Sequence, residues 1–107
     1  MIARLWHGKV SSAKATDYHQ YLLATGLKEY AAVPGNRSVS LLKKEDGNIT
    51  HYYTLTYWDD VNAIKQFAGE DYEKARYYPE DKDYLLEFEP LVIHYEVLEH
   101  LVNAQSE

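Results

Sequence analysis

The sequence predicts an α+β fold, a ferredoxin-like β-α-β-β-α-β domain whose antiparallel sheet carries helices on one face. Its length of 107 residues suits one domain with a modest core. Strand-like and helix-like periodicities alternate along it, and residues 45–48 (Glu-Asp-Gly-Asn) are a hairpin signal between two strand-like segments. We therefore expect a single domain over residues 1–107, with an ordered core from about residue 2 to about residue 100.

The first third of the chain predicts a strand and then a helix. Residues 2–10 alternate as a strand with apolar or aromatic groups on both faces. Ser11 or Ser12 can cap the helix that follows. Gly26 interrupts this helix at a cost of about 1 kcal/mol relative to alanine, and Pro34 ends it because the residue before proline avoids helical angles.

The middle of the chain predicts a β-hairpin. Its strands are residues 38–44 and 49–58. In the second strand, one face carries Thr50, Tyr52, Thr54, Thr56 and Trp58, and the other carries His51, Tyr53, Leu55 and Tyr57. Because successive strand residues point to opposite faces, this alternation fixes which side chains lie together.

The last third predicts a helix, a connector and a closing strand. Asp59 or Asp60 caps the helix, and Gly69 stops it. Residues 70–78 have the spacing of a second short helical piece. Residues 79–90 form a charged connector, residues 91–99 the fourth strand, and about the last six residues are expected to fray.

Composition excludes several classes of function. The formal charge of −6 and the pI near 5.3 argue against a nucleic-acid partner, since phosphate binding relies on basic patches. The chain has no cysteine, which excludes disulfides, thiolate catalysis and cysteine-based metal centres. No apolar run is long enough for a membrane span, and the N-terminus lacks a signal-peptide pattern. We expect a soluble, cytoplasmic protein with no membrane partner.

The aromatic content is unusual because eleven of the aromatic residues are tyrosine. Tyrosine buries a large ring and keeps a polar tip. This surplus suits an aromatic-walled cavity, a polar-edged dimer interface or half-buried strands. A sheet with helices on one face also leaves its other face bare, and Trp6 and Tyr57 are poor residues to expose there. We therefore expect a homodimer in which two sheets pack face to face.

Several segments together resemble the antibiotic biosynthesis monooxygenase superfamily. They are Pro34-Gly35-Asn36, Tyr57-Trp58-Asp59, Phe67-Ala68-Gly69-Glu70-Asp71 and His94-Tyr95-Glu96-Val97, in the β-α-β-β-α-β order. The resemblance spans residue 2 to about residue 99 and is greatest to an uncharacterised branch of small stand-alone domains. It implies a dimeric α+β barrel with a pocket between sheet and helices in each protomer.

The resemblance also implies two kinds of activity. Some members oxidise phenolic or quinol-type aromatics with dioxygen and no cofactor, and others bind and degrade haem. In haem-degrading members an Asn, a Trp and a His are used where this chain has Trp6 or His7, Phe67 and Tyr77. None of these matches, although Tyr77 could ligate iron as a phenolate, so haem degradation is the less favoured activity.

The oxidising members carry a Trp at the end of the third strand, which Trp58 retains, and an Asn four residues earlier, where this chain has Thr54. The resemblance therefore predicts a cofactor-independent monooxygenase. Such an enzyme needs a base and donors for an oxyanion. The expected catalytic residues are His7 and His94, and the expected substrate-binding residues are Trp58, Thr54, Phe67, Tyr72 and Tyr77.

Each of these residues also has a structural explanation. His7 and His94 could be strand histidines satisfied by local hydrogen bonds, and the aromatic residues could be core or edge packing. Glu96 shares a strand face with His94, so His7, His94 and Glu96 could form an iron site, but no metal is expected. The alternative function is a non-catalytic dimeric domain that binds a small apolar ligand or serves as a scaffold.

Overall fold

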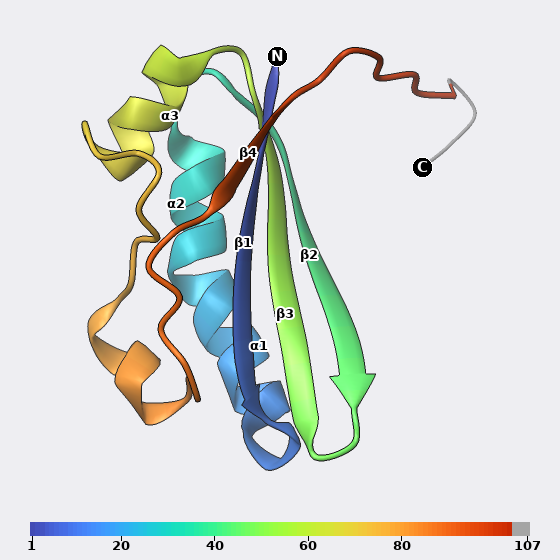
Figure 1. The fold of residues 1–107 in the computed structure, drawn as a ribbon, viewed down its shortest axis with the longest axis vertical. Helices are drawn as coiled ribbons and strands as arrows, with labels where there is room; N and C mark the ends of the chain where they lie inside the picture. Colours follow the sequence, from blue (N-terminus) through green and yellow to red (C-terminus); the bar gives the residue numbers. More distant parts are fainter. Residues whose placement is uncertain (104–107) are drawn as a thin grey trace.

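The computed structural model describes residues 1–103 and contains the expected order of strands and helices (Figure 1). The strands are β1 (Ile2–Ser11), β2 (Asn36–Asp46), β3 (Ile49–Trp58) and β4 (Ile93–Glu96). The α-helices are α1 (Ala15–Ala24), α2 (Gly26–Ala32) and α3 (Val61–Ala68). Two short 3-10 helices are η1 (Ser12–Lys14) and η2 (Pro79–Asp83).

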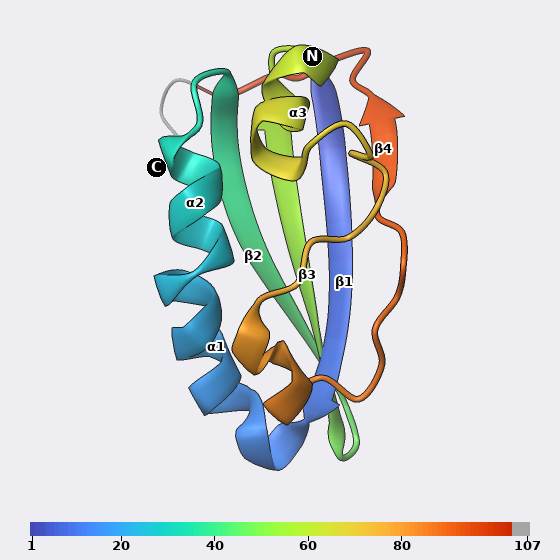
Figure 2. The same ribbon diagram turned by 90° about the vertical axis from the view of Figure 1, so that its left-hand side faces the viewer.

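The four strands form one antiparallel sheet in the order β2-β3-β1-β4. The two long central strands, β1 and β3, pair along their whole length, from Ile2 opposite Trp58 to Ser11 opposite Ile49. All three α-helices and the connector between α3 and β4 lie against one face of the sheet, as both views show (Figure 2). The predicted ferredoxin-like α+β fold with helices on one face is therefore confirmed.

The register of β1 and β3 decides which side chains are covered. Trp6 lies opposite Thr54, and Tyr57 lies opposite Ala3. Trp6 and Thr54 are buried under the helices, whereas Tyr57 belongs to the opposite face. The expectation that Trp6 lies on the bare face with Tyr57 was wrong, because the two-residue period of the strands places the two rings on opposite faces.

The core under the helices consists of two clusters of buried side chains. The lower cluster contains Trp6, Val10, Tyr18, Leu22, Tyr52, Leu85 and Val92. The upper cluster contains Tyr30, Trp58, Ala63, Ile64 and Phe67. Leu27 packs against both, so α2 joins the clusters over the middle of the sheet.

The expected first helix is broken into α1 and α2 at Thr25. The backbone of Thr25 leaves helical angles (φ −116°, ψ −98°), and its amide and hydroxyl both donate to the carbonyl of Tyr21. α3 begins and ends as predicted. Asp60 caps it by accepting from the Ala63 amide at 2.9 Å, and Gly69 ends it at φ 86°, an angle that favours glycine.

The predicted helical piece over residues 70–78 does not form. The backbone of this segment bonds to a distant part of the chain instead: the Ala75 amide donates to the carbonyl of Pro90, and the carbonyl of Glu73 accepts from the Val92 amide. These bonds replace the local bonds of a helix, so the segment is a turn followed by extended backbone. From here on, the connector means residues 69–92, which include the charged segment expected over residues 79–90.

The fourth strand is shorter than residues 91–99, because only four of its residues pair with β1, from Ile93 opposite Leu5 to Glu96 opposite Ile2. Residue 91 pairs with Lys74 instead. At the other end, the Val97 amide donates to the carbonyl of Met1, where β1 begins. The chain then leaves the sheet on its bare side, where His100 contacts the ring of Tyr57. Of the segment expected to fray, residues 104–107 lie outside the described part of the chain.

Candidate functional site

A small cavity lies between the helix-covered face of the sheet, α1, α2 and the connector. Its volume is about 20 Å³, which is room for about one water molecule. Its walls come from four segments that are distant in the sequence: Trp6, Tyr18, Leu22, Gly26, Leu27, Tyr30, Thr54, Arg76, Tyr78 and Asp81. Four of these ten residues are aromatic, and the wall also carries polar side chains, among them Thr54, Arg76 and Asp81.

Two hydroxyl groups form the polar part of the wall on the side of the sheet. Tyr30 projects from α2 toward β3, and its hydroxyl lies 3.2 Å from the hydroxyl of Thr54. Both residues are buried. In a hydroxyl pair, each group can donate as well as accept, so the pair can offer a hydrogen to an oxygen atom placed in the cavity.

A buried arginine forms a hydrogen bond with one hydroxyl of this pair. Arg4 is 1% exposed, and its guanidinium donates to the Tyr30 hydroxyl at 3.3 Å and to the Lys74 carbonyl at 3.4 Å. Its Nε has no hydrogen-bond partner within residues 1–103, and its charge lies over the ring of Phe67, 5.5 Å from the centroid. Burial lowers the pKa of Arg4, and the neighbouring phenol groups of Tyr30 and Tyr78 oppose that shift.

A buried carboxylate lies in another part of the wall. Asp81 is 3% exposed; it accepts from the Tyr18 hydroxyl at 2.9 Å and from the Tyr78 amide at 2.6 Å. Burial raises the pKa of Asp81 above its ordinary value, and these two hydrogen bonds oppose the rise. Burial also raises the pKa of Tyr18, with Asp81 adding to that shift. A carboxylate with a raised pKa in a closed site has the properties of a general base.

The cavity is closed on the helix side by contacts from the connector to Glu29 of α2. The Tyr78 hydroxyl donates to Glu29, and the Arg76 guanidinium lies 3.6 Å from the same carboxylate. Arg76 also donates to the Phe67 carbonyl at 2.9 Å. We call the contacts of Glu29 with Tyr78 and Arg76 the Glu29 latch.

Of the expected substrate-binding residues, Thr54 lines this cavity. Trp58 and Phe67 are core residues of the upper cluster. The Trp58 indole is fully buried and donates to the Thr56 hydroxyl at 2.8 Å. The ring of Phe67 packs against two cations, with the guanidinium of Arg4 5.5 Å and that of Arg76 5.0 Å from its centroid.

Tyr72 and His94 meet at another place, near the edge strand β4. Their rings are 5.2 Å apart in an edge-to-face arrangement, and both line a surface pocket of about 270 Å³ with Ile2, Val61, Tyr95 and Glu96. The Nε2 atom of His94 is buried, and no group in the described part of the chain forms a hydrogen bond with it. Burial lowers the pKa of His94, and the charge of Arg4 lowers it further.

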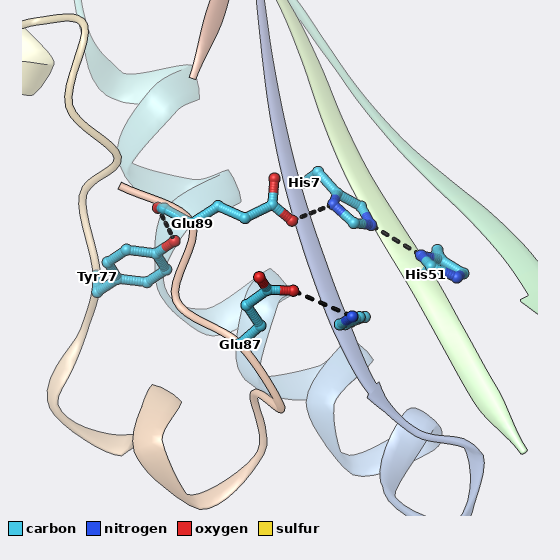
Figure 3. Close-up of polar contacts among 6 residues, drawn as sticks. His7, His51, Tyr77, Glu87 and Glu89 are labelled. Atoms are coloured by element: carbon cyan, nitrogen blue, oxygen red, sulfur yellow. Dashed lines mark hydrogen bonds and ion pairs between the residues drawn. The ribbon is translucent and has the colours of Figure 1, made fainter. Parts of the chain in front are cut away.

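His7 lies on the bare face of the sheet in a polar chain that Figure 3 shows. Its Nδ1 contacts the Glu89 carboxylate, its Nε2 lies 2.8 Å from Nδ1 of His51, and its ring stacks on Tyr53. Tyr77 donates to the carbonyl of the same Glu89. These polar contacts hold the connector against the edge of β1, as the neighbouring ion pair of Lys9 and Glu87 also does.

The sheet therefore does not bring His7 and His94 together. His94 is opposite Arg4 in the register and faces the helices, whereas His7 belongs to the alternate set of β1. Within residues 1–103, no three histidine, aspartate or glutamate side chains are close enough to hold a metal ion. A catalytic role for either histidine stays a prediction.

Sequence reasoning missed Asp81, Tyr30 and Arg4. Asp81 stood in the segment 79–90, which was expected to be a charged connector. The signal that could have identified it is Pro79, since proline at the start of a helical turn and aspartate two residues later form a capping pattern. For Arg4, the signal is a charged residue on the same strand face as Trp6, in a segment with apolar groups on both faces.

Solved structures with this fold share low sequence identity with the chain. One is a protein of Nitrosomonas europaea assigned to the antibiotic biosynthesis monooxygenases: the TM-score is 0.66 and the identity 16%, over 92% of this chain and 100% of that chain. Another is the haem degrader MhuD of Mycobacterium tuberculosis with two haems bound in its active site, with a TM-score of 0.60 and 16% identity over 95% and 100%. A third is a monooxygenase of Streptomyces coelicolor in complex with nanaomycin D, with a TM-score of 0.58 and 15% identity over 96% and 91%.

No protein-family model matches the sequence, and no curated protein matches it. None of the helices within residues 1–103 has the length and apolarity to cross a membrane. At identities near 16% the likeness concerns the fold. At that level it confirms the resemblance found in the sequence: the chain has the fold of the antibiotic biosynthesis monooxygenase structures.

Proposed function

We propose that the protein is a cofactor-independent monooxygenase of a small phenolic or quinol-type aromatic, which it binds in the cavity between sheet and helices. The observation that carries the proposal is the pairing, in one aromatic-walled cavity, of a buried hydroxyl pair with a buried carboxylate of raised pKa. The fold supports it, because structures with this fold include a monooxygenase and a haem degrader.

The proposed reaction uses dioxygen as the only co-reactant. A base removes the phenol proton, and the phenolate passes an electron to dioxygen, which gives a phenoxyl radical and superoxide. These combine at a ring carbon that carries hydrogen, and the resulting peroxide anion takes back the proton held by the base, forming a hydroperoxide. Loss of that hydrogen and cleavage of the O–O bond then give a quinone and water, so one oxygen atom enters the product and the other leaves as water.

The residues of the cavity have separate roles in this scheme. Asp81 takes the phenol proton, because burial shifts its pKa upward, toward neutral pH, where a general base is most effective. Tyr30 and Thr54 donate to the developing oxyanion. Trp6 and Tyr78 hold the ring by aromatic contact. Asp81 takes the place expected for His7 or His94, because those two side chains do not line the cavity.

An aromatic ring needs more room than about 20 Å³, so the connector has to move before the ligand enters. The connector is suited to such a movement because it has little regular secondary structure apart from η2. The Glu29 latch is the contact that opening would break. The side chains of Glu29 and Arg76 are both partly exposed, so their ion pair adds little to the energy of the latch.

The proposal includes a homodimer formed through the bare face of the sheet. That face carries exposed apolar side chains on both edge strands, among them Leu42 of β2 and Ile93 and Tyr95 of β4. Beyond β4, Leu98 and Leu101 are also exposed. Exposed apolar side chains of this size are typical of a protein interface.

The test uses a panel of hydroquinones, naphthols and anthrones. Dioxygen uptake is measured in air, and product formation is compared in air and in the absence of oxygen. We expect uptake with at least one class, and a loss of about a hundredfold or more in Asp81→Asn. Tyr30→Phe should lose about a hundredfold. The exposed Asp83 supplies the matched control Asp83→Asn. His7→Ala and His94→Ala should leave the rate near that of the wild type.

The alternative is a non-catalytic domain that binds a small ligand or serves as a scaffold, and the small size of the cavity is the observation that favours it. No dioxygen-dependent product from any compound of the panel would support this alternative. If instead His7→Ala or His94→Ala abolished turnover and Asp81→Asn did not, the base would be a histidine and the assignment to Asp81 would be wrong.

A further inference from the structure

Arg4 is a buried cation without a carboxylate partner. It is 1% exposed, and among residues 1–103 no aspartate or glutamate forms an ion pair with it. Its hydrogen bonds go to two neutral groups, the Tyr30 hydroxyl and the Lys74 carbonyl. Buried charges in proteins are normally paired, because an isolated ion loses its hydration and gains little in return.

The surroundings of Arg4 do not supply the missing charge. Phe67 offers the face of its ring, but Arg76 lies over the same ring at 5.0 Å and adds a second positive charge. The titratable groups that act on Arg4 are the phenols of Tyr30 and Tyr78 and the imidazole of His94. In their neutral forms, none of these three groups supplies a negative charge to balance that of Arg4.

The charge of Arg4 reaches the cavity through Tyr30. Arg4 donates to the oxygen of the Tyr30 hydroxyl, so the hydrogen of that hydroxyl is free to point to Thr54 or to a ligand. A cation that donates to a hydroxyl polarises it and makes it a stronger donor. An oxyanion in the cavity would thus receive a strengthened hydrogen bond and lie close to an unpaired positive charge.

We propose that the cavity binds its aromatic ligand as an oxyanion, a phenolate or naphtholate, and that Arg4 is the positioning residue that selects this charge state through Tyr30. The inference rests on the proposed function, since it specifies the ionic state of the substrate in the same cavity. Neutral aromatics of the same shape, such as the matching methyl ethers, bind more weakly because they leave Arg4 without a counter-charge.

The test uses nitrophenol as a probe, because its phenol and phenolate forms absorb at different wavelengths. The probe is titrated with the wild-type protein at a pH at which the free probe is mostly the neutral phenol. We expect the phenolate band to grow on binding. The affinity for nitroanisole, its methyl ether, should be lower by a factor of about ten or more, since nitroanisole lacks the charge-assisted hydrogen bond.

Three variants separate the role of Arg4 from its contribution to the fold. Arg4→Met should bind the probe as the neutral phenol, and Arg4→Lys should restore part of the phenolate band. Tyr30→Phe keeps the buried cation but removes the link, so it should also lose the band, even where Arg4→Met fails to fold. Arg37→Gln, at an exposed arginine paired with Asp59, is the control and should behave as the wild type.

The outcomes also separate this inference from the proposed function. If the wild type binds nitrophenol in its neutral form, or binds nitroanisole equally well, the selection of an anion is wrong while the ligand cavity stands. If neither probe binds, yet a compound of the substrate panel is oxidised, the inference also fails. If no probe binds and no compound is oxidised, the proposed function fails as well.

Discussion

The hydroxyl of Tyr18 donates to the carboxylate of Asp81 at 2.9 Å, and both side chains are buried. This bond joins α1 to the connector across 63 positions of the sequence. Asp81 is thus at once a structural tie and the carboxylate of the cavity wall. Each role of Asp81 leads to its own prediction, one for the stability of the protein and one for turnover.

The stability prediction for Asp81 concerns acidic and mildly acidic pH. Burial raises its folded pKa above the ordinary 3.8, so the folded protein holds the proton to a higher pH than the unfolded chain. The contribution of this group to stability is therefore full below pH 3.8 and is lost as the pH rises through the folded pKa. Asp81→Asn should remove this loss, so its free energy of unfolding should improve relative to the wild type across that window. Urea unfolding at a series of pH values checks this, with Asp83→Asn as control; an unchanged difference across the window would contradict it.

His94 should have the opposite dependence on pH. Burial and the charge of Arg4 lower its folded pKa below 6.5, so the unfolded chain takes up the proton first. Its contribution to stability is present above pH 6.5 and is lost as the pH falls through the folded value. His94→Gln should flatten the fall in unfolding temperature on acidification, whereas His19→Gln, at an exposed histidine, should not. Parallel curves for the wild type and His94→Gln would show that His94 is not the titrating group.

The Glu29 latch should control how often the connector leaves α2. Glu29→Ala removes the acceptor of Tyr78 and the partner of Arg76, at a cost of about 1–3 kcal/mol that comes mainly from the lost hydrogen bond, because the ion pair is partly exposed. The amides of residues 75–85 should then exchange hydrogen with deuterium severalfold faster, as measured by mass spectrometry, while those of β1 and β3 should not change. Lys28→Ala is the matched control on the exposed side of the same helix. Faster exchange throughout the sheet would instead indicate global destabilisation.

Gly8 allows the Trp6 ring to lie close to the backbone of β1. A Cβ at Gly8 would lie 2.4 Å from the Trp6 ring and 2.9 Å from the side chain of Leu85. Gly8→Ala should therefore push Trp6 toward the cavity and destabilise the protein by about 1–3 kcal/mol. Chemical unfolding followed by tryptophan fluorescence measures this. At Gly47, nothing lies within 4 Å and φ is +61°, so Gly47→Asn should cost little; equal losses for the two variants would contradict the packing argument.

Local signals in the sequence predicted most of the fold. The alternation from Ile49 to Trp58 placed β3 correctly, because it has one buried and one less buried face. Asp60 and Gly69 marked the ends of α3 by their own chemistry. The segment 70–78 was mispredicted because its helical spacing was overruled by bonds to residues 90–92, which no local pattern reveals.

The candidate site was less accessible to sequence reasoning. Thr54 was found because its strand alternation and the family resemblance both pointed to it. Asp81 was not, because its burial depends on Tyr18, which lies far away in the sequence. His7 and His94 were placed on neighbouring strands correctly, but their faces depend on the register of β1 with β4, which the sequence does not specify.

The most direct test of the proposed function is the fate of isotopically labelled dioxygen. The account predicts that the wild-type protein, given a naphthol or hydroquinone that it oxidises, places one labelled oxygen atom in the quinone product and the other in water, and that Asp81→Asn forms almost none of this product. Mass spectrometry of the product decides the question. A product without the label, or labelled product formed equally by Asp81→Asn, would contradict a monooxygenase site in this cavity.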